Sequence, residues 1–331
     1  MQQVVSSEEL LAAALQVYEQ GKHPLTAMFG RDENLNGAGY AIYCCFEVPE
    51  KRDVHIVKGV FPAEGSLSYE SLTHAIPAAA WYEREIHDMF GLVPEGHPDL
   101  RPLVLHESFP EDFHPLRKSV AVNAKVRGER KFKIRTAKGQ GLFQVPVGPI
   151  HAGIIEPGHF RFSQAGEAML QLDAKLFFTH RGIEKAVEGK TPEEALHIVE
   201  RICGACSVAN TWSFCQTVEK AAGVAVPRRA EIIRTLLSEL ERITNHVGDL
   251  GNMPAGVGFN PAISLGSRLK EQLMRLCEAV AGNRFLRGVI VPGGVRQDIT
   301  PELIEHIHEV MDATAQGVED LAAMFREQEN F

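Results

Sequence analysis

The sequence contains few cysteines, no long hydrophobic run and no excess of basic residues, and each absence excludes a class of protein. Six cysteines in 331 residues are too few for a disulfide scaffold. No stretch approaches the roughly 18–20 apolar residues that a membrane-spanning helix requires, and the N-terminal MQQVVSSEELL has no signal-peptide pattern. These absences predict a protein of the reducing cytoplasm.

The charge and the length of the chain indicate its class of partner and its number of domains. The chain carries 34 Lys and Arg against 43 Asp and Glu, a net charge of −9, which argues against nucleic acid as a partner. Apolar residues make up 44% of the chain, a proportion typical of globular rather than disordered proteins. The length is sufficient for two domains, each with its own core.

The periodicity predicts an α+β fold, in which an α/β domain is followed by a mainly α-helical region. Near the N-terminus, Ser6 or Ser7 is placed to cap a helix. The elements predicted in the first part are a helix over Glu8–Gln20, strands at Tyr40–Val48 and Val54–Val60, and a helix over Ser71–Asp88 that Pro77 interrupts. From Phe143 onward the pattern is mainly helical, with apolar residues at three- and four-residue steps in Ile232–Val247, Leu265–Ala281 and Pro301–Phe325.

A basic segment separates the two parts and sets the predicted domain boundaries. Between Arg117 and Lys138 there are nine Lys or Arg residues and one acid, Glu129. Such a segment is typical of a solvated linker, of an arm on an acidic partner subunit, or of a contact with anionic lipid headgroups. We therefore expect domains at 1–120 and 143–331, joined by a basic linker at 121–142.

The strongest candidate site is the segment Arg201-Ile202-Cys203-Gly204-Ala205-Cys206. Two thiolates separated by two residues can converge on one soft metal ion, and Gly204 lets the backbone fold around it. The motif alone leaves open half of a zinc site, a redox dithiol, a pair of cluster ligands, or two cysteines packed beside a helix. No second CxxC and no HxxxH occurs in the chain, so the set of ligands is incomplete.

Glu156 is the candidate for proton transfer, because it lies on a Pro-Gly turn in the segment Glu156–Arg161. A carboxylate that is buried near a metal is suited to general acid–base chemistry. The alternative is a surface turn in which Glu156 pairs with Arg161.

Two further patterns indicate structural roles. The alternating charges of the segment 179–185 are typical of a salt-bridged helix start. Cys44 and Cys45 would point to opposite faces of a strand, and Cys215 and Cys277 occupy helical core positions. We expect all four to be buried as small hydrophobic residues.

Together these motifs resemble two known families. RICGAC, preceded by GPIHAGIIEPGHFRF and HRGIEK, resembles the large subunit of the NiFe hydrogenases of the membrane-associated, energy-converting type. Upstream, EREIHDMFG, GHPDLR and HPLRK are similar to the C subunit of bacterial complex I, which would make 1–120 a docking domain. A single chain with both in this order resembles the large subunits of formate hydrogenlyase and hydrogenase-4.

The resemblance implies a role for each candidate residue. Cys203 would be a terminal nickel ligand, Cys206 would bridge nickel to an iron that carries cyanide and carbon monoxide, and Glu156 would pass protons. The reaction implied is H2 ⇌ 2H+ + 2e−. The family's second CxxC pair is absent, so we expect the chain to be the N-terminal part of a longer subunit. Asn210 stands where the family has a histidine, which would alter hydrogen bonding around the metal.

The same resemblance implies partners and a location. Electrons would pass to a 4Fe–4S cluster in a small subunit like the complex I B subunit. Other hydrophilic and membrane subunits, with formate dehydrogenase as a further partner, would hold the protein peripherally at the cytoplasmic face of the membrane. Two alternatives stay open, a quinone-reducing C/D subunit like that of complex I and a non-catalytic assembly subunit.

Overall fold

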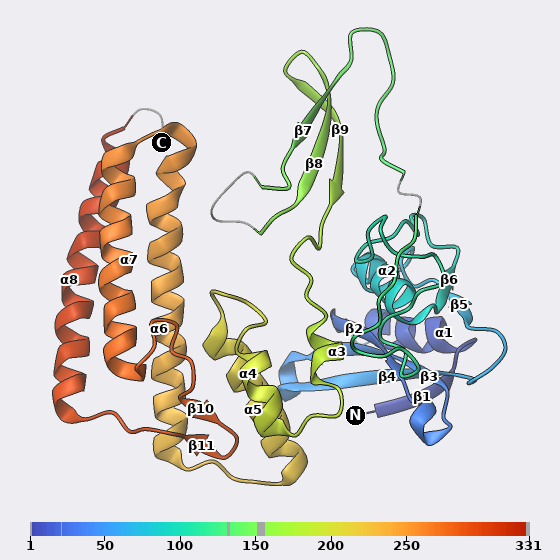
Figure 1. Ribbon diagram of the computed structural model, residues 1–331, viewed down its shortest axis with the longest axis horizontal. Coiled ribbons are helices and arrows are strands. Elements are labelled where there is room, and N and C mark those ends of the chain that lie inside the picture. The colour runs from blue at the N-terminus through green and yellow to red at the C-terminus, as the bar shows by residue number, and fades with distance from the viewer. Residues whose placement is uncertain (1, 21, 131–132, 151–155, 329–331) are drawn as a thin grey trace. The chain divides into compact units, whose positions relative to one another are not determined.

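The computed structural model describes residues 2–20, 22–130, 133–150 and 156–328. Among these, the chain forms two compact units, of which the first ends at Arg181 and the second begins at Gly182 (Figure 1). We call them unit 1 and unit 2. The predicted domain boundaries at 120 and 142 both fall inside unit 1. The division of the chain into two domains of different families stays a prediction.

The main sheet of unit 1 has four strands in the order β1-β4-β3-β2, in which β1 is parallel to β4 and the other pairs are antiparallel. The strands are β1 (Gln2–Ser6), β2 (Leu25–Asp32), β3 (Tyr40–Val48) and β4 (Asp53–Phe61). The two predicted strands are confirmed as β3 and β4. The two edge strands were missed, because neither shows a regular alternation of apolar and polar residues.

Two helices cover one face of this sheet, α1 (Leu10–Leu15), which continues as a π-helical turn (Gln16–Gln20), and α2 (Ala79–Phe90). Gly30 and Gly59 both lie opposite Ile42, so they share a face. A Cβ at Gly30 would lie 2.6 Å from the Phe90 ring, and one at Gly59 would lie 3.0 Å from Leu10. The absence of these side chains lets both helices pack closely on the sheet.

The predicted caps near the N-terminus are wrong. Helix α1 begins only after Glu9, and no side chain caps it. Instead the Glu9 carboxylate accepts hydrogen bonds from the amide and the hydroxyl of Ser6, at 3.1 and 3.0 Å. Ser6 itself ends β1, so its backbone is already committed to the sheet.

A second, antiparallel sheet occupies the part of the chain that the periodicity assigned to helices. It consists of β7 (Phe143–Val147), β8 (His159–Ala165) and β9 (Ala168–Lys175). The mainly helical region therefore starts later than predicted, at Ile183. The alternation in HFRFSQ favours a strand, and a helical pattern further along the chain obscured it.

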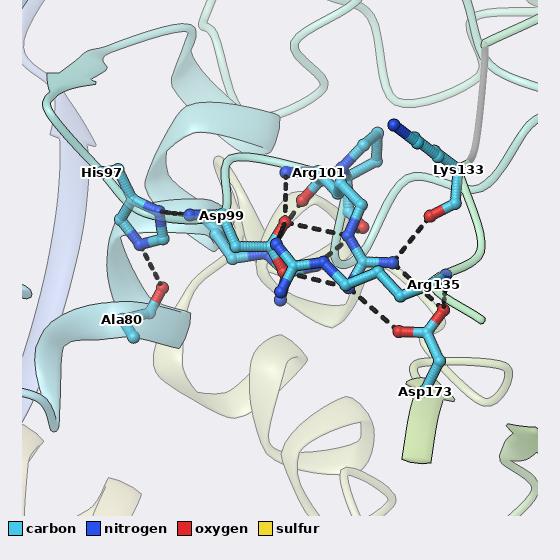
Figure 2. A network of polar contacts seen from close by, with 9 residues as sticks. Ala80, His97, Asp99, Arg101, Lys133, Arg135 and Asp173 are labelled. Carbon is cyan, nitrogen blue, oxygen red and sulfur yellow. Dashed lines mark hydrogen bonds and ion pairs between the residues drawn. The ribbon is translucent and has the colours of Figure 1, made fainter. Parts of the chain in front are cut away.

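The charged motifs of unit 1 hold its loops together. Figure 2 shows Arg101 between the carboxylates of Asp99 and Asp173, with nitrogen–oxygen distances of 2.8 and 3.0 Å. The backbone amide of Arg135 donates to Asp173 at 2.9 Å, and its guanidinium pairs with Asp99 at 3.2 Å. Because Asp173 belongs to β9, this network fastens the second sheet to the loops of unit 1.

One side chain of the basic segment is packed, so the solvated-linker interpretation is wrong for Arg130, whereas most other described residues of the segment are exposed. Arg130 is 8% exposed and pairs with the fully buried Asp88 at 3.0 Å. The other Asp88 oxygen accepts three backbone amides, from Leu103, Val104 and Leu105. Arg130 thus neutralises a carboxylate that the fold has removed from water.

Unit 2 is helical, and its three long helices α6, α7 and α8 confirm the predicted stripes. The helices are α3 (Ile183–Val187), α4 (Pro192–Val199), α5 (Ser207–Ala222), α6 (Arg228–Asn252), α7 (Asn260–Ala281) and α8 (Pro301–Arg326). Helices α6 and α7 meet backbone to backbone, because a Cβ at Gly266 would lie 2.1 Å from the Gly251 Cα. Leu237, Leu276 and Cys277 lie in the core that these helices share with α5.

Short elements complete the two units. They are the pairs β5 (Ser68–Glu70) with β6 (Val93–Glu95) and β10 (Ile290–Val291) with β11 (Gly294–Val295), and 3-10 turns at Asn34–Asn36, Pro49–Lys51 and Met253–Val257. Within the described residues, no helix is both long enough and apolar enough to cross a membrane.

Candidate metal centre

The two cysteines of the CxxC motif lie together in unit 2, in the loop between α4 and α5. Cys206 is the residue that immediately precedes α5, and Cys203 lies three positions earlier. Both side chains are half-buried. Burial, as the main cause, and a hydrogen bond with the Cys203 side chain, as the second, raise the pKa of Cys206 to about 11. The predicted pair therefore has adjacent sulfur atoms.

Three contacts hold the loop in this shape. The Glu200 carboxylate, which is 2% exposed, accepts the amide of Gly288 at 2.6 Å. Asn245 of α6 donates its side-chain amide to the Ala205 carbonyl at 2.8 Å. Asn210 donates its own to the Cys206 carbonyl at 2.7 Å. The residue that replaces the expected histidine therefore supports the backbone of the cysteine loop.

Glu241 of α6 lies at the N-terminus of α5, and no sequence motif marks it. Its carboxylate accepts the backbone amides of Val208 and Ala209, at 2.6 and 3.1 Å. Burial raises the pKa of Glu241, while these amides oppose the increase. A carboxylate at a helix N-terminus is favourable, but only the packing of α6 brings this one to α5, so no local signal could have revealed it.

A cavity of about 410 Å³ adjoins the cysteine loop. Three cationic side chains, Lys270, Arg284 and Arg287, line it together with one carboxylate, that of Glu241. The remaining lining residues are Gly204, Ala205, Ser207, Thr244, Asn245, Met274, Cys277, Phe285 and Leu286. The backbone between the two cysteines thus forms one wall of a chamber with excess positive charge.

The donor atoms present fit one half of a soft-metal site. Two thiols converge, which suits nickel, iron or zinc better than a hard cation. In the part of the chain that the structure describes, no group of three or more Cys, His, Asp or Glu side chains is arranged to hold a metal. The cysteine pair can therefore contribute two ligands, and the described residues do not supply the rest.

Three of the other four cysteines are buried as predicted, whereas Cys45 is only half-buried. Cys44, Cys215 and Cys277 are at most 2% exposed, and burial raises the pKa of each thiol. Cys45 follows Cys44 on β3 and is half-buried on the opposite face. Cys44 belongs to the apolar core of unit 1, and Cys215 and Cys277 belong to that of unit 2, so these three thiols pack as small hydrophobic residues.

Glu156 lies in unit 1, where the turn before β8 places it. The turn is closed by the Gly158 amide, which donates to the Pro149 carbonyl at 3.1 Å. The Glu156 side chain is exposed and accepts a hydrogen bond from the Thr179 hydroxyl at 2.7 Å. Arg161, its partner in the surface-turn interpretation, instead contacts His159 at 3.5 Å. His151, which belongs to the segment GPIHAGIIEPGHFRF, lies outside the described residues.

Family models match three consecutive parts of the chain. Residues 3–126 match the respiratory-chain NADH dehydrogenase 30 Kd subunit, residues 181–249 the nickel-dependent hydrogenases, and residues 257–331 the respiratory-chain NADH dehydrogenase 49 Kd subunit. Over these ranges the chain is homologous to nickel-dependent hydrogenases and to two subunits of respiratory-chain NADH dehydrogenase. The resemblance inferred from the motifs is confirmed.

Individual relatives agree with the family models. The chain is 37% identical to hydrogenase-4 component G of Escherichia coli over 86% of this chain and 52% of that protein. It is 33% identical to formate hydrogenlyase subunit 5 of the same organism, over 92% of this chain and 54% of that protein. The C/D subunit of the NADH-quinone oxidoreductase of Phocaeicola vulgatus is 28% identical over 88% of this chain and 59% of that protein. The chain spans about half the length of the curated relatives it matches.

Proposed function

We propose that this chain belongs to the catalytic subunit of a NiFe hydrogenase that interconverts H2 with two protons and two electrons. The observation that carries the proposal is the adjacent, half-buried sulfur pair of Cys203 and Cys206, in a segment that matches the nickel-dependent hydrogenases. A nickel–iron centre with cyanide and carbon monoxide on the iron supplies the cleavage of H2 when it is bound. Cys203 would hold nickel, and Cys206 both metals.

The protein supplies the surroundings of that centre. Glu200, Asn210 and Asn245 hold the backbone of the cysteine loop, so the two sulfur atoms lie together without a metal. The cations around the adjoining cavity favour negatively charged groups within it. Both features suit a metal centre that carries thiolates and anionic ligands.

Glu156 is the group that we assign to proton transfer. Its carboxylate can accept a proton and release it, and it is not locked in an ion pair by Arg161. Its exposed side chain can exchange protons with a neighbouring group or with water. Such a group is needed wherever the cleavage of H2 releases protons that must reach the solvent.

Electrons would leave through a partner subunit that carries an iron–sulfur cluster. We propose a small subunit with a 4Fe–4S cluster, like the complex I B subunit, as the direct partner. Further hydrophilic and membrane subunits, with formate dehydrogenase among the candidates, would attach the protein to the cytoplasmic face of the membrane. The named relatives are components of hydrogenase and NADH-quinone oxidoreductase complexes, which supports this assignment.

A quinone-reducing role is the second candidate, because complex I family models cover residues 3–126 and 257–331. Its relatives are less similar, since the Phocaeicola protein is 28% identical whereas the hydrogenase-4 component is 37% identical. A non-catalytic assembly role is the third. Neither of these roles requires the soft metal ligands that Cys203 and Cys206 provide.

Metal analysis of the complex purified from cells distinguishes the three functions. The hydrogenase function requires nickel and iron in the large subunit and exchange of D2 with protons of water. Quinone reduction without nickel would establish the second function instead. Absence of nickel together with absence of both activities would leave the assembly role.

A further inference from the structure

A hydroxyl group contacts the proposed proton-transfer residue. Thr179 Oγ1 donates to Glu156 Oε2 over 2.7 Å, across 23 positions of sequence. We propose that Thr179 is a positioning residue that holds the Glu156 carboxylate in the geometry required for proton transfer. This inference rests on the function proposed above for Glu156.

The register of the second sheet brings the two residues together. His159 at the start of β8 lies opposite Lys175 at the end of β9. Because the strands are antiparallel, the chain enters β8 from Glu156 and leaves β9 toward Thr179 at the same end of the sheet. The contact is therefore a consequence of the sheet and not of an isolated side-chain rotamer.

The segment before Thr179 is anchored on both sides of a strained residue. Phe177 has a φ of 60°, which non-glycine residues rarely adopt and which persists only where the surroundings fix the backbone. His106 provides that support, since its Nε2 lies 2.7 Å from the Leu176 carbonyl oxygen. Its ring also packs edge-on against Phe178, with 4.7 Å between the ring centroids. Thr179 thus follows a fixed backbone and is itself half-buried.

A hydroxyl suits this role better than a charged partner. It can donate to the ionised carboxylate and accept from the protonated one, so it holds Glu156 in both states of a proton-transfer cycle. A guanidinium would favour the ionised state alone. Arg161 lies nearby in sequence but contacts His159 instead.

The test is a double-mutant cycle in the complex purified from cells, with the rate of D2/H+ exchange as the readout. Thr179→Val should lower exchange about three- to tenfold, the effect of losing one hydrogen bond. Thr179→Ser keeps the hydroxyl and should stay within about twofold of wild type. In the Glu156→Gln background, Thr179→Val should cause no further loss.

Two controls separate positioning from folding. Nickel content should be equal in all variants, because no metal ligand is changed. Thr26→Val, which removes an exposed hydroxyl bonded to the Cys45 carbonyl elsewhere in unit 1, should leave exchange unchanged.

The outcomes distinguish this inference from the proposed function. An equal fold-loss from Thr179→Val in both backgrounds would show that Thr179 acts through the fold, and it would overturn the positioning role. Wild-type exchange in Thr179→Val, with loss in Glu156→Gln, would overturn the positioning role and leave Glu156 as the proton-transfer group. Wild-type exchange in Glu156→Gln would overturn both.

Discussion

The charged motifs of unit 1 and the cysteine loop of unit 2 both stand out in the sequence, yet the fold uses them differently. The Asp88 carboxylate is saturated by three amides and Arg130, and Arg101 is shared between two carboxylates. In contrast, the backbone around Cys203 and Cys206 is held by neighbouring side chains, whereas the sulfur atoms face each other. A conspicuous motif is thus a candidate metal-binding motif only where its side chains are not already occupied by hydrogen bonds and ion pairs within the protein.

The largest effect should come from the cysteine pair. Cys203→Ser or Cys206→Ser should abolish nickel retention and H2 evolution, because a hydroxyl is a poor substitute for a soft thiolate. Metal content of the purified complex measures this directly. Cys44→Ser is the matched control, since this thiol is buried in β3, and it should keep its nickel. Nickel at wild-type level in either of the first two variants would refute the ligand assignment.

Glu156→Gln should give the next largest effect. The substitution preserves the size of the side chain and can still accept from Thr179, but it removes the titratable group. We expect the variant to keep nickel while D2/H+ exchange falls by about 10- to 1,000-fold, as for the loss of a general acid–base group. Undiminished exchange in a nickel-replete variant would mean that protons follow another path.

Removal of the cation that pairs with the buried Asp88 carboxylate should cause a large loss of stability in unit 1 and should leave the metal ligands unchanged. Arg130→Met should lower the free energy of unfolding of unit 1 by about 3–5 kcal/mol, because it leaves the buried Asp88 charge unpaired. Arg135→Gln, at a guanidinium that is 48% exposed, should cost about 0–1 kcal/mol. The chain has two tryptophans, so Trp81 fluorescence in a Trp212→Phe background reports denaturation of unit 1. Equal losses in the two variants would contradict the difference in burial.

Helix packing in unit 2 predicts a smaller loss. Gly266→Ala would ordinarily favour a helix, but here the new Cβ would meet the Gly251 backbone. We expect a net loss of about 1–3 kcal/mol, as for other overpacked sites. Trp212 fluorescence in a Trp81→Phe background measures it. Gly256→Ala is the control, since nothing lies within 4 Å of its added Cβ, and a stabilised Gly266→Ala variant would show that the helices separate at little cost.

The sequence by itself determined the cysteine motif, the central strands β3 and β4, and the long helices α6, α7 and α8. Each depends on a local spacing or a hydrophobic period that the chain expresses over a few residues. The same local logic failed where two periods competed, as in the second sheet, and at Ser6, whose backbone belongs to a strand.

Only the tertiary structure decided which groups distant in the sequence contact one another. Glu241 reaches the start of α5 across 33 positions, Thr179 reaches Glu156 across 23, and Arg130 reaches Asp88 across 42. No periodicity links such pairs, because their contact depends on how whole elements pack. The sequence thus made Cys203, Cys206 and Glu156 candidates, by motif and by family resemblance, whereas the fold selected the neighbours that contact them.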